Sequence, residues 1–160
     1  MVELENWKTI IVPQRRESGC IPTGYEWLIR YLNIQRVDFR NFQEEFDFGQ
    51  SNSFDYVAAR IKSKYPAVSI QIMHFSQGVK KIDYIRSLIE AQTPCLISLA
   101  LGRGQGWHIM PVVSIDNDKI EMIHDADGNG NHTWAFPVTE VIWKHDNLQG
   151  GDDISWIDSS

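Results

Sequence analysis

The chain has 160 residues, the length of one ordinary domain, and 42% of them are hydrophobic, which is enough apolar surface for a packed core and argues against disorder. We therefore expect a single domain over residues 1–160. The formal net charge of −6 argues against a nucleic-acid surface, because phosphate binding needs clustered cations and Arg15 and Arg16 are the only adjacent arginines.

The amino terminus and the hydropathy pattern favour a cytoplasmic protein. Residues 1–8 contain no basic segment followed by an apolar stretch, which a secretory signal would have. The longest apolar runs are too short to span a membrane, so no membrane association is expected. A reducing compartment would keep the two cysteines as thiols.

Helical patterns dominate the first half of the chain. An amphipathic helix is predicted from Cys20 to about Asn33, with Pro22 in its first turn, from the apolar residues Ile21, Tyr25, Leu28, Ile29 and Leu32. Residues 36–53 carry phenylalanines without a steady period and predict a short helix plus a loop. Two further apolar stripes with helical spacing cover residues 54–61 and 79–89.

Strand patterns follow after Thr93 and Pro94. Residues 95–101 are almost continuously apolar, which is typical of a central strand covered on both faces. A glycine-rich loop at 102–106 leads into a strand at 107–115, and a turn at 116–118 leads to its partner at 119–124. A strand at 133–136, a small helix at 139–144 and a strand at 154–157 complete the pattern. Helices followed by a mostly antiparallel sheet predict an α+β fold.

Cys20 is the candidate nucleophile. It stands at the predicted start of a helix, where free backbone N–H groups and the helix dipole are expected to lower a thiol pKa. Gln14, six residues upstream, is placed to donate its amide to an oxyanion that grows on an attacked carbonyl. Cys95 lies in an apolar run, which predicts that it is buried as a small hydrophobic residue. The cysteine count alone also permits a disulfide with Cys20.

His108 is the candidate base. Imidazole is the side chain whose ordinary pKa lies near neutrality, and His108 opens a predicted strand beside the glycine-rich loop. A base of this kind needs an acceptor on its other ring nitrogen to fix its tautomer. Asp125, at the end of the partner strand, is expected to supply that acceptor, and Asp127 is close enough to compete.

These residues resemble the papain-like cysteine peptidases, and more closely the bacteriocin-processing type that cleaves double-glycine leader peptides. In that family a Gln lies six residues before the Cys of a Cys-Gly-Pro-Thr helix start, and here Gln14 precedes the run Cys20-Ile21-Pro22-Thr23. The family's His opens a strand and its Asp ends the next one, which His108 and Asp125 match with a separation of seventeen residues.

The resemblance implies a papain-like fold, in which the nucleophile helix packs on the sheet half, and a cysteine peptidase or isopeptidase. Cys20 would attack the carbonyl, His108 would act as base and then acid, and Asp125 would orient His108. Gln14 and the Cys20 backbone N–H would form the oxyanion hole. Ile21 replaces the family's Gly and predicts a narrower acyl-side subsite.

Other functions stay open at this point. The same thioester chemistry serves an acyltransferase, and a papain-like domain without activity would be a binding module. Residues 125–131 have the composition of a calcium loop, but Phe136 stands where the closing Glu would be, so a tight turn is favoured. The glycine-rich loop lacks the Gly-Lys-Ser/Thr ending of a nucleotide site. We expect no cofactor and no metal, and a peptide or protein substrate as the partner.

Overall fold

The computed structural model describes residues 2–15, 19–49, 54–103, 106–124 and 132–158 of the chain. In this part, one antiparallel sheet forms the centre, with strands in the order β2-β7-β3-β4-β5-β6 and β1 added beside β4. The strands are β1 (Val2–Glu3), β2 (Ser69–His74), β3 (Cys95–Ala100), β4 (Trp107–Ile115), β5 (Lys119–Ile123), β6 (Thr133–Pro137) and β7 (Asp153–Asp158).

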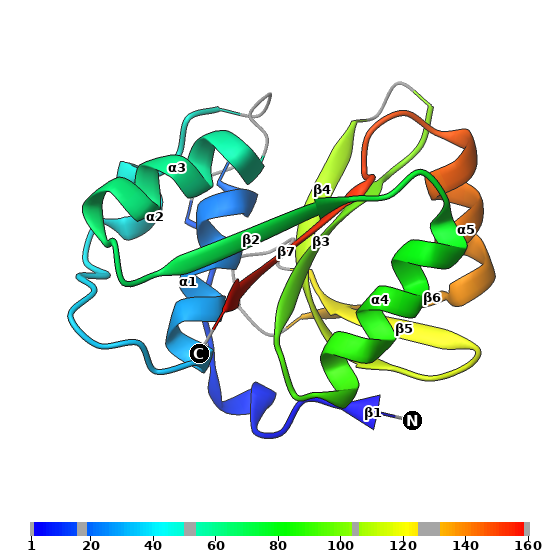
Figure 1. Ribbon diagram of the computed structural model, residues 1–160, viewed down its shortest axis with the longest axis horizontal. Helices are drawn as coiled ribbons and strands as arrows, with labels where there is room; N and C mark the ends of the chain where they lie inside the picture. Colours follow the sequence, from blue (N-terminus) through cyan, green and yellow to red (C-terminus); the bar gives the residue numbers. More distant parts are fainter. Residues whose placement is uncertain (1, 16–18, 50–53, 104–105, 125–131, 159–160) are drawn as a thin grey trace.

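Two groups of helices flank this sheet, as Figure 1 shows. One side carries α1 (Cys20–Tyr31), α2 (Phe42–Glu45) and α3 (Phe54–Lys64), and the other carries α4 (Gly78–Glu90) and α5 (Val138–Asn147). A short 3-10 helix, η1 (Trp7–Thr9), follows β1. Both α1 and the α4–α5 pair contact β3, so every residue of that strand is buried. Within the described residues, no helix has the length and hydrophobicity that crossing a membrane requires.

The helix α1 is enclosed on several sides, which explains its composition. Residues 21–29 are all buried, since the helix lies between β3 and β4 on one side and α2 and α3 on the other. Gly24 permits the closest approach to the sheet, because a Cβ at this position would lie 2.9 Å from both methyl carbons of Leu96. A larger residue would require the Leu96 side chain or α1 to shift.

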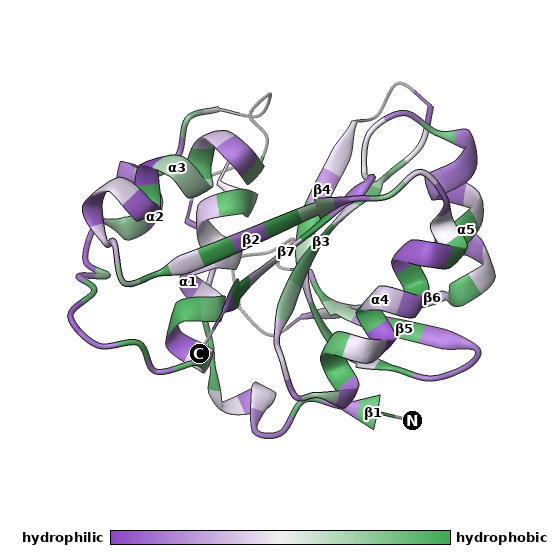
Figure 2. Ribbon diagram, viewed as in Figure 1, coloured by the Kyte–Doolittle hydropathy of each residue, from purple (hydrophilic) through white to green (hydrophobic). Residues whose placement is uncertain are grey.

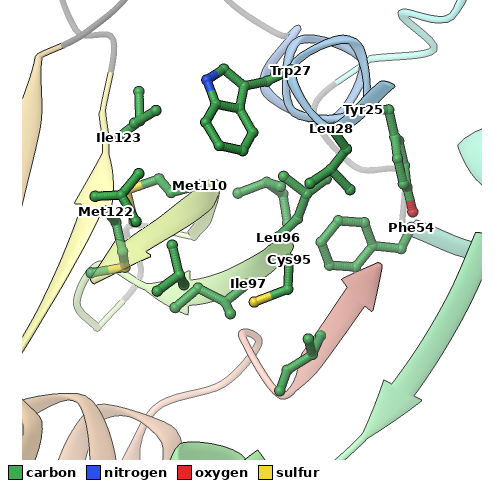
Figure 3. Close-up of a cluster of buried hydrophobic side chains, with 14 of the residues drawn as sticks. Tyr25, Trp27, Leu28, Phe54, Cys95, Leu96, Ile97, Met110, Met122 and Ile123 are labelled. Carbon is green, nitrogen blue, oxygen red and sulfur yellow. The ribbon is translucent and has the colours of Figure 1, made fainter. Parts of the chain in front are cut away.

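The core fills the space between α1 and the strands. Figure 3 shows Trp27 and Leu28 of α1 above the β3 and β4 side chains Leu96 and Met110. In Figure 2 β3 is mostly hydrophobic, whereas β2 carries hydrophobic and hydrophilic residues in turn. Ile21 belongs to this core, with 3% of its surface exposed.

The predicted α+β organisation is confirmed, and each helix and strand expected from the sequence is present with its ends shifted by a few residues. Two strands of the described part were missed, the two-residue β1 and the longer β2. β2 alternates Ile70 and Ile72 with polar residues, the pattern of a half-buried strand, and it lies at the edge of the sheet with β7 as its partner.

Candidate active site

Three of the predicted site residues line one pocket. Gln14 lies in the loop before α1, Cys20 is the first residue of α1, and His108 is the second residue of β4. The packing of α1 on β4 brings these distant segments together. Asp125 and Asp127 lie outside the described residues, as does the candidate calcium loop at 125–131.

The pocket is small and mostly apolar. Its free volume is about 20 Å³, which is room for about one water molecule. Apolar side chains complete its walls, among them Val12, Trp27, Ile109 and Ile123. The pocket is therefore too small to hold a side chain of another molecule.

The side chain of Ile21 does not lie in the wall of the pocket beside Cys20, where the sequence predicts it. Its side chain packs into the hydrophobic core, whereas the residues that line the pocket beside Cys20 include Thr23 and Gly24. The expectation that Ile21 narrows the acyl-side subsite is therefore not supported by its packing.

The protonation of Cys20 differs from the prediction. Burial raises the pKa of the Cys20 thiol, and this effect outweighs that of the nearby backbone N–H groups of Ile109, Cys20 and Ile21, which lower its pKa. The predicted lowering of the pKa by the helix end is thus wrong in its net direction. The helix end contributes as expected, but the surrounding side chains remove the sulfur from water.

His108 is held in its neutral form at pH 7. Burial, and to a smaller extent the neighbouring His124, lowers the pKa of His108 to about 4. The two imidazole rings meet edge to face, with their centroids 4.9 Å apart. A neutral imidazole has a lone pair that can accept a proton, and the Cys20 thiol and the His108 ring are both uncharged at pH 7.

His124 is a site neighbour that the sequence analysis missed. It directly follows β5, its backbone N–H donates to the carbonyl of His132, and its ring also contacts Trp134. The available signal was its position immediately before Asp125, at the end of the strand that pairs with β4. Its ring forms part of the surroundings that keep His108 neutral.

Gln43 is a second residue that the sequence analysis missed, and it fixes the loop that carries Gln14. Its amide Nε2 donates to the carbonyl of Pro13 at 2.9 Å, and its Oε1 accepts the backbone N–H of Arg15 at 2.9 Å. These two bonds hold the residues on either side of Gln14.

The same side chain ties this loop to α1. Gln43 Oε1 also lies 2.9 Å from the hydroxyl of Thr23, and its Nε2 lies 3.3 Å from Glu26 Oε1. Gln43 is fully buried. A buried amide with partners for both its oxygen and its nitrogen holds its neighbours in one arrangement. Nothing in the local sequence marks Gln43, because its partners lie 17 to 30 residues away.

Metal-ligating side chains gather in a different place. In the described part of the chain, the donor atoms of His74, Asp152 and Asp153 lie within 4.8 Å of one another, at the end where β2 pairs with β7. The glycine-rich loop borders a third region. Gly102, Arg103 and Gly106 line an open depression of about 610 Å³ together with the segment after α5.

Cys95 behaves as predicted. It is fully buried in β3, it is a free thiol like Cys20, and burial raises its pKa to about 12. Such a thiol is inert at neutral pH.

Comparisons with known proteins identify the fold. No protein-family model matches the chain, and no curated protein matches it. A crystal structure from Bacillus anthracis, described as a "putative C39-like peptidase", matches with a TM-score of 0.65 at 14% sequence identity, over 99% of this chain and 98% of the other. At this identity the similarity concerns the fold, and it agrees with the α+β fold expected from the sequence.

Proposed function

We propose that this protein is a cysteine-dependent hydrolase that cleaves a peptide or isopeptide bond. The observation that carries this proposal is the convergence of Gln14, Cys20 and His108 in one small pocket. These are an amide donor, a nucleophile and a base, the three parts that acyl transfer through a thioester requires. The shared fold with a structure described as a peptidase adds support at the level of architecture.

The first half of the reaction forms a thioester. His108 takes the thiol proton as the Cys20 sulfur attacks the carbonyl carbon, and both groups start uncharged because the site is buried. The carbonyl oxygen becomes an oxyanion that accepts hydrogen bonds from the Gln14 amide and the Cys20 backbone N–H. His108 then gives its proton to the leaving amine as the carbon–nitrogen bond breaks.

The second half regenerates the enzyme. A water molecule attacks the thioester carbonyl while His108 removes its proton, and the carbon–sulfur bond breaks to release the acid and return the proton to Cys20. Asp125 is proposed to orient His108 through its other ring nitrogen.

Digestion of a proteome-derived peptide library tests this function. We expect the wild-type protein to generate new peptide termini that mass spectrometry detects, and Cys20→Ser to generate none. Cys95→Ala is the matched control because it removes the other thiol, and its cleavage sites should equal those of the wild type. An undiminished cleavage pattern in Cys20→Ser, or no cleavage by the wild type, would overturn the proposal.

A further inference from the structure

A second cavity adjoins the Cys20 pocket. It has a volume of about 150 Å³, and Ile109 lines both cavities. Ile109 directly follows His108 in β4, and its backbone N–H is one of the groups that act on the pKa of the Cys20 thiol. A group bound in the second cavity would therefore lie next to the proposed reacting atoms.

Part of the lining of this second cavity is apolar, and we call it the apolar half. It consists of Phe54 of α3 and Trp107 and Ile109 of β4. Phe54 is 1% exposed and packs edge to face against Tyr25 of α1, so this wall is fixed by the core. The indole and the phenyl ring suit the hydrocarbon stem of a long side chain.

The other side chains of the lining are polar, and we call them the acidic half. They are Asp152 and Asp153 together with His74 and Ser98. The Nδ1 atom of His74 lies 3.5 Å from Asp152 Oδ1 and 4.0 Å from Asp153 Oδ2. Asp55 adds a third carboxylate, 3.7 Å from the other ring nitrogen of His74.

The buried lysine next to this cluster does not balance its charge. Lys81 donates to the backbone carbonyls of Ser98 at 2.6 Å and Gly151 at 2.7 Å, and it acts on Asp153 and Asp152 through space. One lysine thus faces two carboxylates, and Asp55, which does not line the cavity, adds a further negative charge beside His74. The acidic half retains a negative potential that attracts a further cation.

The acidic half is also rigid. Ser98 donates its hydroxyl to the Asp153 carboxylate and accepts the Asp153 backbone N–H at 3.1 Å. Gly151, with φ +75°, lies so close to β3 that a Cβ would be 2.6 Å from the Ala100 nitrogen. The Asp153 carboxylate is therefore held in position before any ligand binds, which lowers the entropic cost of binding.

On the premise of the proposed hydrolase function, we infer that this second cavity selects a lysine or arginine side chain of the substrate. The hydrocarbon stem lies along Phe54, Trp107 and Ile109, and the cationic end meets Asp152 and Asp153. A metal ion would use the acidic half alone, and its donors His74 and Asp152 have side chains that are 55% and 57% exposed. A long cationic side chain matches both halves of the cavity.

Matched covalent probes test this specificity. The probes are acetyl-dipeptidyl acyloxymethyl ketones that carry lysine or norleucine at either of the two positions before the reactive carbon. Norleucine keeps the hydrocarbon stem and lacks the charge. Intact-mass spectrometry measures the second-order rate of Cys20 labelling, in buffer with EDTA so that no divalent cation occupies the cavity. At one of the positions, lysine should react about tenfold faster than norleucine, as expected for a hydrogen-bonded charge pair.

Three variants distinguish an effect of the cavity on the lysine preference from an effect of the protein's net charge. Asp152→Asn should reduce the lysine preference at least threefold, and Asp152→Lys should abolish it. Both changes are at an exposed side chain, so the fold should survive them. Glu90→Gln removes one negative charge at an exposed position on α4 outside the cavity, and it should keep the wild-type preference.

The outcomes distinguish the two proposals. No labelling of Cys20 by any probe would overturn the proposed function, and with it this inference. Labelling at equal rates with lysine and norleucine at both positions would leave the function standing and overturn the specificity alone. An equal loss of preference in Glu90→Gln and Asp152→Asn would also overturn it, since the cause would then be the net charge.

Discussion

The pKa values of His108 and Cys20 depend on the residues that bury them more than on the neighbouring residues in the sequence. The helix end beside Cys20 is readable from the sequence, and its backbone N–H groups do lower the thiol pKa. Burial has the larger effect, and it depends on packing between α1 and β4, which are far apart in the chain. The residue types of the site were therefore predictable, whereas their protonation was not.

The buried His108 should make the stability of the protein depend on pH. Its pKa is about 4 in the folded chain and 6.5 as a free side chain, so the unfolded chain binds more protons between these values. The contribution of His108 to the free energy of unfolding, up to about 3 kcal/mol, is present above pH 6.5 and is lost as the pH falls toward 4. His108→Gln should flatten this acid limb in urea unfolding measured at pH 4.5 and 7. Parallel pH curves for variant and wild type would contradict the burial of a neutral His108.

At the scale of elements, the loop that carries Gln14 depends on α2. Gln43, the second residue of α2, bonds the backbone on both sides of Gln14 and also reaches Thr23 of α1. Long-range hydrogen bonds of this kind have no local sequence pattern. The helical and strand periodicities were sufficient to predict the elements. The hydrogen bonds by which Gln43 joins the Gln14 loop to α1 and α2 could not be predicted from the sequence.

Gln43→Leu should lower kcat/KM because it releases the Gln14 loop. It should also lower the free energy of unfolding by about 1–3 kcal/mol, since it leaves buried backbone partners without their bonds. The two effects are separated by repeating the change in a Gln14→Ala background. If Gln43 acts through Gln14, its effect on kcat/KM should largely disappear there while the loss of stability remains. An equal loss of kcat/KM in both backgrounds would assign Gln43 a structural role only.

At the scale of the whole molecule, the fold was largely predictable because the elements have clear periods. The apolar run of β3 predicts a strand buried on both faces, and helices contact it from both groups. The convergence of Gln14, Cys20 and His108 was expected from their resemblance to a known arrangement. The second cavity was not predictable, because Phe54, Trp107 and Asp153 come from three elements that meet only in the folded chain.

The central claim is that catalysis proceeds through a thioester on Cys20. A peptide cleaved in the library digestion, incubated with the wild-type protein and increasing hydroxylamine, tests it directly by mass spectrometry. The thioester predicts that the amino-terminal product appears as a hydroxamate, in a proportion that rises with hydroxylamine, and that Cys20→Ser forms neither hydroxamate nor acid. Free acid as the sole product at every hydroxylamine concentration would contradict it, because water would then attack the peptide bond directly.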